Sequence, residues 1–396
     1  MRIKNVLGST LVIMLCVLFS IGYAEDKNDF KSYKQKMDSE FEQYEDKQEK
    51  EFKEYRKKLE KAFQEYKESV SKVWGKKHVA VPSRKDWVQY RDNMRERNIV
   101  NFKNGTAKVQ VKMTEQKAKN SEKCQKELRQ AVVNTIAASA DTRSIIDIAK
   151  KPSTPRENSH PAVLKGQIKN KQGEKVTSEN AKDFAKQVVK DKKVQKIEQK
   201  KDEGEKGVIA SVEFKLVPDH LKKRAKRYMP IVTEHAKKRD FEVQLILALI
   251  ETESYFNPTA RSPIPAFGLM QLVPTTGGRD AYQFVYGKDK APTDEFLYQP
   301  EKNVRLGVAY MHIVYTRYLK EIKNEKSRLW CTIAAYNTGA GNVLRTFAPG
   351  KEEALQKINS MDPEEVYSYL RRELPYKETR KYVKKVRNKM AHYSSI

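Results

Sequence analysis

Apolar residues near the N-terminus follow an eleven-residue repeat. Four copies begin with Phe-x-x-Tyr, at Phe30, Phe41, Phe52 and Phe63. Intervening apolar residues extend these pairs into a stripe with spacings of three and four, which predicts one long helix. Eleven residues make three helical turns, so such helices associate with little or slightly right-handed supercoiling. The stripe fits either a coiled coil or partner-binding arm, or a charged helix that packs on its own protein.

The second pattern, over residues 75–216, mixes helical and strand-like segments and predicts a small α/β domain. Residues 99–111 contain two alternating apolar runs joined by Asn104-Gly105, which is a strong signal for a β-hairpin. Before this hairpin we expect a helix around residues 87–97, with Ser83 as its N-cap.

Two further segments complete the predicted α/β domain. Residues 131–150 have helical character, and residues 182–206 are rich in lysine. Like charges in a block repel one another and stay solvated, so the lysine-rich segment is typical of an exposed helix face.

The third pattern, over residues 217–396, consists of helical segments separated by loops that contain proline and glycine. It predicts an all-helical domain. One helix, from Phe241, is apolar on nearly every face through residues 243–250 and must therefore be buried. The predicted fold class is mainly α, with the small α/β domain between a long N-terminal helix and the helical domain.

The first residues have the layout of a secretory signal. Arg2 and Lys4 precede a nearly continuous apolar run over residues 11–21, and Gly22-Tyr23-Ala24 follows. The run is shorter than the about 20 apolar residues that cross a bilayer, although an uncleaved anchor is the alternative. Cys16 follows a leucine rather than a small residue, so we expect no lipidation there. The predicted regions are a signal peptide (1–24), a long helix (25–74), the α/β domain (75–216) and the helical domain (217–396).

The chain of 396 residues has 79 Lys and Arg against 52 Asp and Glu, a formal net charge of +27. This charge favours an anionic partner such as nucleic acid, anionic lipid or an acidic wall polymer. The basic residues lack an aromatic-interleaved recognition module, and the signal directs the chain out of the cytoplasm. We therefore expect no nucleic-acid partner, but contact with a membrane surface or wall polymer in the periplasm or cell envelope.

Two cysteines remain after signal cleavage, Cys124 and Cys331. They either form one disulfide in an oxidising compartment or stay two separate, unreactive thiols. The six histidines show no HxxH or HExxH spacing, and no CxxC pair accompanies them. We predict no metal and no cofactor.

Two carboxylates, Glu251 and Glu253, end the buried helix of the third region. A carboxylate that lies against apolar groups without a paired cation has a raised pKa, as a general acid near neutral pH requires. Helical spacing does not distinguish the two, because both follow apolar residues three and four positions earlier. The alternative is that both are solvated at an exposed helix end.

Three separated motifs occur in the same region. Residues 253–276 contain Glu-Ser-Tyr-Phe-Asn-Pro, then Ala-Arg-Ser and Gly-Leu-Met-Gln; residues 334–339 read Ala-Ala-Tyr-Asn-Thr-Gly; residues 374–383 read Leu-Pro-Tyr-Lys-Glu-Thr-Arg-Lys-Tyr-Val. In order and spacing they resemble the signature of the soluble lytic transglycosylase family. The resemblance covers about residues 218–386, implies a lysozyme-like helical catalytic domain, and places the catalytic glutamate at Glu253.

A second resemblance lies in the preceding region. Trp74-Gly75 and residues 82–90 and 100–105 are similar to the domain in front of the catalytic unit in the membrane-bound lytic transglycosylase C family. Members of that family are typically outer-membrane lipoproteins, and the context of Cys16 departs from this pattern. The eleven-residue repeat lies outside the resemblance, so self-association or a protein partner of that helix is expected from the repeat alone.

The resemblance implies an enzyme that cleaves the β-1,4 bond between N-acetylmuramic acid and N-acetylglucosamine in peptidoglycan. Glu253 would protonate the linking oxygen and then, as a base, take a proton from the muramoyl 6-hydroxyl, which gives a 1,6-anhydro end without water. The substrate-binding residues carried over by motif position are Ser262, Met270, Gln271, Tyr336, Asn337, Tyr376 and Glu378.

The carboxylates near the signature agree with a single catalytic glutamate. Most glycosidases use two, but here the nearest others, Asp280 and Glu295, lie in a stretch with glycines and a proline where we expect exposure. Two alternatives share the same residues: a muramidase that hydrolyses the same bond, and a non-catalytic peptidoglycan-binding scaffold.

Overall fold

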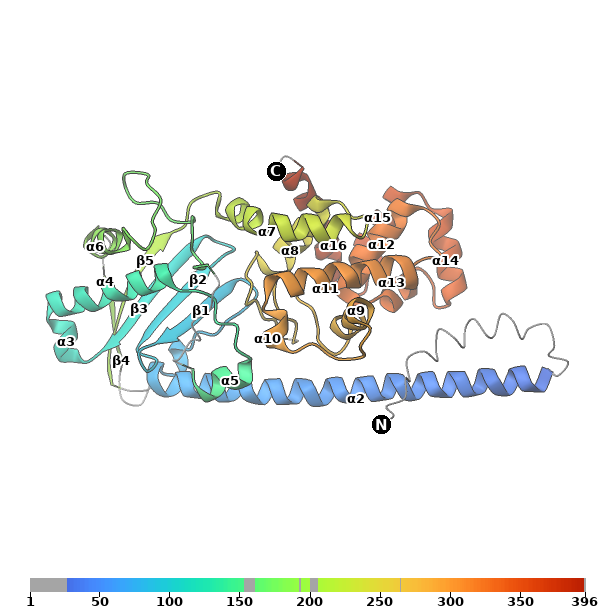
Figure 1. The fold of residues 1–396 in the computed structure, drawn as a ribbon, viewed down its shortest axis with the longest axis horizontal. Helices are drawn as coiled ribbons and strands as arrows, with labels where there is room; N and C mark the ends of the chain where they lie inside the picture. Colours follow the sequence, from blue (N-terminus) through green and yellow to red (C-terminus); the bar gives the residue numbers. More distant parts are fainter. Residues whose placement is uncertain (1–26, 153–160, 192–193, 200–205, 264, 395–396) are drawn as a thin grey trace, which may run out of the picture. The chain divides into compact units, whose positions relative to one another are not determined.

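The computed structural model describes residues 27–152, 161–191, 194–199, 206–263 and 265–394 (Figure 1). The chain divides into two compact units, Met1–Tyr55 and Arg56–Ile396. The predicted signal peptide and Cys16 lie outside the described residues. In the part of the chain that is described, no helix combines the length and apolar character needed to span a bilayer.

The region predicted as a long N-terminal helix contains the helix α2 (Lys27–Trp74), whereas its eleven-residue repeat stays a prediction. In its last turns, the side chains of Tyr66 and Trp74 are buried, and both rings lie about 6 Å from the ring of Tyr90. The indole N–H of Trp74 donates to the carbonyl of Met94 at 2.6 Å. This end of the helix therefore packs on its own protein, whereas self-association through the repeat stays a prediction.

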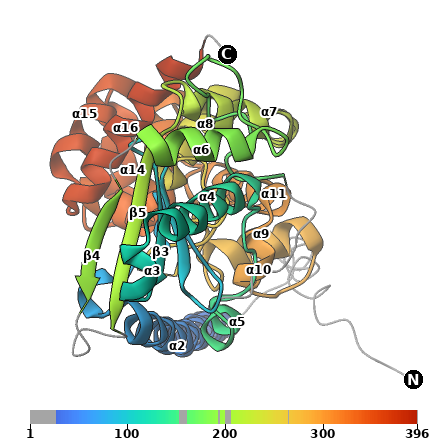
Figure 2. The same cartoon turned by 90° about the vertical axis from the view of Figure 1, so that its left-hand side faces the viewer.

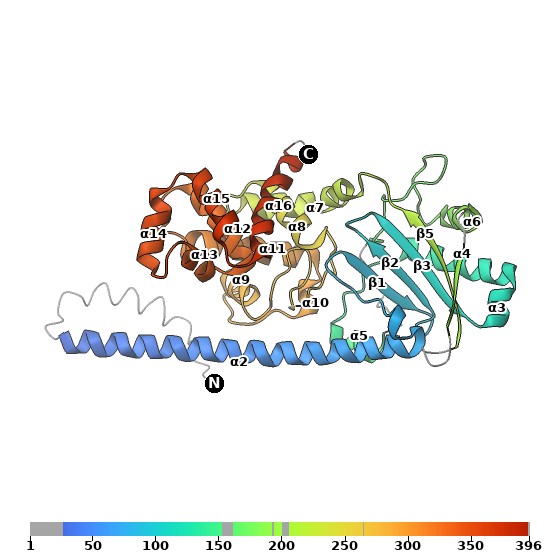
Figure 3. The same cartoon turned by 180° about the vertical axis from the view of Figure 1, so that it is seen from behind.

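The α/β part of the second unit contains one antiparallel sheet with strand order β1-β2-β3-β5-β4 (Figures 1 and 3). The strands are β1 (Asp86–Arg91), β2 (Glu96–Asn101), β3 (Thr106–Met113), β4 (Gln195–Gln199) and β5 (Gly207–Lys215). The predicted hairpin is confirmed, because β2 and β3 pair with Asn101 opposite Thr106. Gly105 in its turn has φ +65°, which glycine adopts without strain.

The helix predicted at residues 87–97 is wrong. These residues form β1, a turn in which Asp92, Asn93 and Met94 have positive φ, and the start of β2. Residues 87–90 are all buried, because this strand is covered on both faces, so the alternation typical of a strand is missing. Ser83 caps no helix; its hydroxyl accepts from the backbone N–H of Asp86 at 3.0 Å and so fixes the entry to β1.

Helices cover one face of this sheet. They are α3 (Glu115–Lys119), α4 (Ser121–Ala137) and α6 (Ala181–Asp191), and Figure 2 shows α4 and α6 in front of the strands, whereas α5 (Ile145–Lys150) lies beside α2. The rings of Phe184 and Phe214 meet edge to face at 5.4 Å between the two layers. The predicted helical character near residues 131–150 is confirmed, as two helices separated by a loop.

The lysine-rich stretch is only partly helical. It begins in α6 but continues as β4, whose residues 195–198 are exposed at the edge of the sheet. Charged residues on an edge strand discourage pairing with another chain, which accounts for lysine in a strand.

The C-terminal part is all helical, as predicted. Its helices are α7 (His220–Lys237), α8 (Val243–Ser254), α9 (Gly277–Tyr286), α10 (Asp294–Leu297), α11 (Pro300–Ile313), α12 (Glu325–Thr338), α13 (Ala340–Phe347), α14 (Lys351–Ser360), α15 (Pro363–Glu373) and α16 (Lys377–Tyr393). Residues 245–250 of α8 are at most 1% exposed, because the helix is apolar on nearly every face. The fold class, mainly α with a small α/β part, is confirmed.

The two cysteines are free and buried in different hydrophobic cores. Cys124 lies in the core between the sheet and its helices, and Cys331 in the core of the helical part. The structure thus supports two separate thiols.

Arg224 of α7 joins the two parts of the unit. Its buried guanidinium donates to the carbonyls of Tyr255 and Phe256 and to the amide oxygen of Gln167, and it lies 3.6 Å from the ring centre of Phe102. Burial lowers the pKa of Arg224 to about 9.

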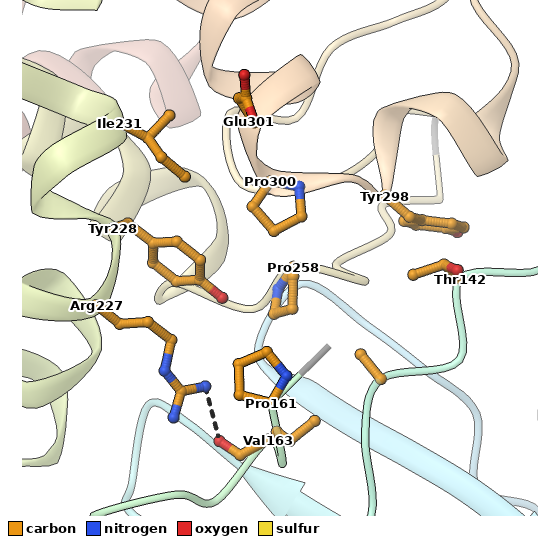
Figure 4. Close-up of a pocket in the computed structure, with 11 residues that line it drawn as sticks. Thr142, Pro161, Val163, Arg227, Tyr228, Ile231, Pro258, Tyr298, Pro300 and Glu301 are labelled. Carbon is orange, nitrogen blue, oxygen red and sulfur yellow. Dashed lines mark hydrogen bonds between the residues drawn. The ribbon is translucent and has the colours of Figure 1, made fainter. Parts of the chain in front are cut away.

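A cavity of about 300 Å³ lies beside this junction (Figure 4). Apolar side chains from α7, α11 and the α/β part surround it, and Arg227 donates to the carbonyl of Val163 at its rim at 3.3 Å. None of the predicted site residues lines this cavity, so it is not the predicted active site.

Candidate active site

The C-terminal end of α8 carries the two candidate carboxylates. The helix stops because Tyr255 and Phe256 adopt left-handed backbone conformations, with φ of 52° and 59°. The hydroxyl of Ser254 donates to the carbonyl of Leu269 at 2.7 Å and ties this end to the loop that follows. Glu251 and Glu253 are both buried rather than solvated.

Glu251 and Glu253 differ in their hydrogen-bond and ion-pair partners. Glu251 is bound on both oxygens, by the ammonium of Lys389 at 2.8 Å and by the hydroxyl of Tyr393 at 2.6 Å. One oxygen of Glu253 accepts from the hydroxyl of Tyr382 at 2.7 Å, and its other oxygen lies 3.7 Å from the Arg84 guanidinium. Glu251 is therefore held in a structural ion pair, and Glu253 is the carboxylate suited to proton transfer.

The pKa of Glu253 is raised. Burial is the largest cause; Arg84 and the hydrogen bond from Tyr382 act against it, and the nearby charge of Glu378 adds to it. Arg84 lies close to this carboxylate, so Glu253 is not without a cation. Burial nevertheless outweighs the cation, and a raised pKa is what a general acid needs.

The loop after α8 is held in place by Asn303 of α11. Its buried side chain accepts from the N–H of Met270 at 2.8 Å and donates to the carbonyls of Phe267 and Leu297 at 2.9 and 2.8 Å. Gly268 has φ +78°, and a Cβ there would lie 2.3 Å from the carbonyl oxygen of Leu297. The close approach of loop and helix therefore requires glycine at this position.

Met270 and Gln271 both lie in this loop and are buried. The Gln271 amide N–H₂ donates to the carbonyls of Ala260 and Gly268, each at 3.0 Å, so this side chain braces the loop. Among the described residues, its amide oxygen has no hydrogen-bond partner. Gln271 thus holds the loop with its amide N–H₂, while its amide oxygen is buried without a hydrogen-bond partner in the described part of the chain.

α12 contributes the opposite wall. The hydroxyl of Tyr336 donates to the carbonyl of Met270 at 2.8 Å, and the charge of Glu253 adds to burial in raising the pKa of Tyr336. The Asn337 side chain accepts from the hydroxyl of Thr379 at 2.8 Å and so connects α12 to α16. These contacts bring Met270, Tyr336 and Glu253 together.

Two of the remaining predicted residues, Ser262 and Glu378, line adjoining cavities, and Tyr376 lines neither. Ser262 lines a cavity of about 460 Å³ that also reaches Phe63 of α2, whereas Glu378 lines one of about 320 Å³ beside Tyr382. The Glu378 carboxylate is exposed and lies 3.4 Å from the Arg84 guanidinium. Tyr376 is 54% exposed at the start of α16. The structure therefore does not bring Ser262 or Tyr376 into the group around Glu253.

Family models match two adjoining segments of the chain. Residues 230–359 match the transglycosylase SLT domain, and residues 51–227 match the N-terminal domain of membrane-bound lytic murein transglycosylase C. The chain is 37% identical over 330 residues to the membrane-bound lytic murein transglycosylase C of Yersinia enterocolitica. The matched residues make up 81% of this chain and 86% of the relative. The enzyme of that name from Serratia proteamaculans matches with the same identity and coverage. The chain belongs to the membrane-bound lytic murein transglycosylase C family.

Membership of the lytic murein transglycosylase C family confirms the expected enzyme class and both sequence resemblances. Solved structures of lytic transglycosylase Slt from Pseudomonas aeruginosa and of the 70 kDa soluble lytic transglycosylase from Escherichia coli are each 27% identical to this chain, with TM-scores of 0.31 and 0.34. They cover 42% and 45% of this chain, which spans 24% and 26% of their lengths.

Three residues in and around the group at Glu253 were missed by the sequence reasoning. Tyr382 stood within the third motif, whose tyrosines offered a signal. Arg84 stood within the segment that resembles the N-terminal domain, where nothing marked it as facing a carboxylate. Asn303 had no signal, because a buried asparagine on a helix is recognised only from what it contacts.

Proposed function

We propose that this transglycosylase cleaves the β-1,4 bond between N-acetylmuramic acid and N-acetylglucosamine of peptidoglycan without water, and leaves 1,6-anhydro-muramoyl ends. Glu253 is its single catalytic acid and base. The observation that carries the proposal is the buried position of Glu253, with a raised pKa and one oxygen held by Tyr382. The family assignment and the names of the relatives support the substrate.

The first step requires Glu253 to be protonated. Its raised pKa increases the protonated fraction near neutral pH, so the carboxyl can give its proton to the linking oxygen as the bond breaks. The sugar's own N-acetyl group supports the positive charge that develops at the anomeric carbon. The electron pair of the broken bond stays on the departing oxygen, which has gained the proton.

The second step requires the same group to be ionised. The Glu253 carboxylate takes the proton of the muramoyl 6-hydroxyl while that oxygen bonds to the anomeric carbon, which restores the acid and closes the anhydro ring. Tyr382 and Arg84 both favour the charged form, so the site stabilises the carboxylate that appears between the two steps.

The other carboxylates do not suit a nucleophile. Asp280 lies on α9, is half-buried and not exposed as expected, and accepts from the hydroxyl of Tyr318 at 2.8 Å. Glu295 lies in the short helix α10. Glu378 is exposed beside Arg84 and raises the pKa of Glu253 through its charge. A single acid and base, helped by the substrate, fits this distribution.

Around Glu253 we propose that Met270, Gln271, Tyr336 and Asn337 form the cleft wall next to the reacting muramoyl unit. Ser262, Tyr376 and Glu378 would contact sugars farther along the strand, since they lie at or beyond the adjoining cavities.

We also propose a location in the cell envelope, which the membrane-bound relatives support. Export through the N-terminal signal, contact of the basic surface with anionic lipid or wall polymer, and association through α2 are further parts of this proposal.

The test is digestion of purified peptidoglycan by the protein without its predicted signal segment, beside Glu253→Gln, with the sugar ends identified by mass spectrometry. Anhydro-muramoyl ends from the unaltered protein alone are expected. Reducing ends would instead identify a muramidase, and the absence of products from both proteins would identify a binding scaffold.

A further inference from the structure

The α/β part of the molecule reaches into the active site through one side chain. We infer that Arg84 is a positioning residue for Glu253. Arg84 secures the end of α8 and supplies the cation that lets the buried Glu253 carboxylate ionise. This inference rests on the proposed role of Glu253. It makes the N-terminal part of the protein a component of the active site and not only an attached domain.

The first argument concerns the hydrogen-bond partners of the backbone carbonyl groups at the end of α8. The last carbonyls of a helix have no partner within the helix. Here the carbonyl of Glu251 accepts from the N–H of Tyr255 at 3.1 Å, and that of Ser254 accepts from the N–H of Asn257 at 2.9 Å. The two between them, of Thr252 and Glu253, accept from Arg84.

The geometry of these two bonds suits a guanidinium. The Nε of Arg84 donates to the Glu253 carbonyl at 2.8 Å, and an Nη donates to the Thr252 carbonyl at 2.9 Å. A planar fork with fixed donor directions can span two adjacent carbonyls, which the single ammonium of a lysine cannot do in the same way. Arg84 therefore fixes the backbone that carries the Glu253 side chain.

The second argument is that the fold places Arg84 and does not leave it as a free surface side chain. The carbonyl of Ser83 accepts from the Asn257 side chain at 3.3 Å, on the loop after α8. On the other side, the carbonyl of Lys85 accepts from the N–H of Phe102, directly after β2, at 2.8 Å. The residue thus lies between two backbone anchors, and its side chain is 33% exposed.

The third argument is electrostatic. Glu253 is at the negative end of the α8 dipole, which opposes ionisation of a carboxylate. The titratable groups that face it are Arg84, Tyr382 and Glu378 of α16, and Tyr336 of α12. Lys385 of α16 lines the same cavity, but Arg84 is the cation that pairs with both carboxylates, 3.7 Å from that of Glu253 and 3.4 Å from that of Glu378.

Removal of Arg84 would leave two carboxylates near each other at the negative end of a helix. Both effects favour the protonated form of Glu253. Protonated Glu253 then gives up its proton less readily, so the first proposed step slows down, and the carboxyl stays protonated up to a higher pH. The position of the alkaline limb of the pH–rate profile is therefore the specific signature of Arg84.

The experiment compares Arg84→Gln, Arg84→Lys and the control Lys103→Gln, which removes one positive charge from an exposed residue near the β2–β3 turn. The rate of release of soluble fragments from peptidoglycan is measured across the pH range for each purified protein. Arg84→Gln is expected to lose about tenfold or more in kcat and to move its alkaline limb to higher pH. Arg84→Lys should restore the limb but only part of kcat, and Lys103→Gln should match the unaltered protein.

An Arg84→Gln profile with the limb in its original position would overturn the inference, even with a lower rate, since it would reduce Arg84 to a helix cap. Circular dichroism checks that each variant folds. If Arg84→Gln does not fold, Arg84→Lys decides: reduced kcat with an unmoved limb supports the inference, and unchanged kcat overturns it. Glu253→Gln runs in parallel, because activity in that variant would refute the proposed role of Glu253 itself.

Discussion

The hydrogen bonds of Asn303 allow a quantitative test of how the active-site loop is held. Asn303→Leu keeps a side chain of similar size and shape but removes one acceptor and two donors. The N–H of Met270 and the carbonyls of Phe267 and Leu297 then lose their side-chain partner in a site that is 0% exposed at residue 303.

Each buried polar group left without a partner costs about 1–3 kcal/mol, so three give roughly 3–9 kcal/mol. We expect a loss near the lower end, about 3 kcal/mol, because the loop can relax and leucine gains apolar contacts. This is a large part of the about 5–15 kcal/mol by which domains are typically stable. Activity should fall as well, since a displacement of about 1 Å at a catalytic wall costs on the order of a hundredfold.

The assay is urea unfolding followed by circular dichroism, together with kcat on peptidoglycan. Asn303→Asp is the matched comparison, because it keeps the acceptor for Met270 but, when ionised, turns two donations into repulsions. It should be more destabilising at neutral pH than in acid, where a protonated carboxyl again donates one bond. The reasoning is refuted if Asn303→Leu unfolds within about 1 kcal/mol of the unaltered protein and keeps its kcat.

Three further predictions concern charge and packing. Because the pKa of Glu253 is raised, the stability it contributes is present below its ordinary pKa and is lost as pH rises through the raised value. Glu253→Gln should therefore unfold at a higher temperature than the unaltered protein at neutral pH, with a gap that closes in acid; a gap independent of pH would contradict this. Tyr382→Phe removes the 2.7 Å bond to the carboxylate and should lower kcat and move the alkaline limb of the pH–rate profile to higher pH; an unmoved limb would show that this bond does not control the acid. Arg224→Met removes the three hydrogen bonds of the buried guanidinium and should lower the free energy of unfolding, measured by urea titration, by about 2–4 kcal/mol. The pH–rate profile should not change. A loss below about 1 kcal/mol would mean that apolar packing alone joins the α/β part to the helical part.

The sequence by itself determined the features that depend on local pattern. The continuous apolar run of α8 required a buried helix, and Asn104-Gly105 required a tight turn between two strands. The order and spacing of the three motifs were enough to identify the enzyme class. Each of these depends on residues close together in the chain, where periodicity and turn chemistry act directly.

The tertiary structure decided which groups meet. Glu251 and Glu253 have the same kind of apolar neighbours along their own helix, so the sequence could not distinguish them. The packing of α16 places Lys389 and Tyr393 against Glu251, and Tyr382 against Glu253. β1 was misread as a helix because burial on both faces removed its alternation. Arg84 reaches Glu253 across 169 positions of sequence, and no local pattern records such a contact, since it exists only once the sheet and the helices have packed together.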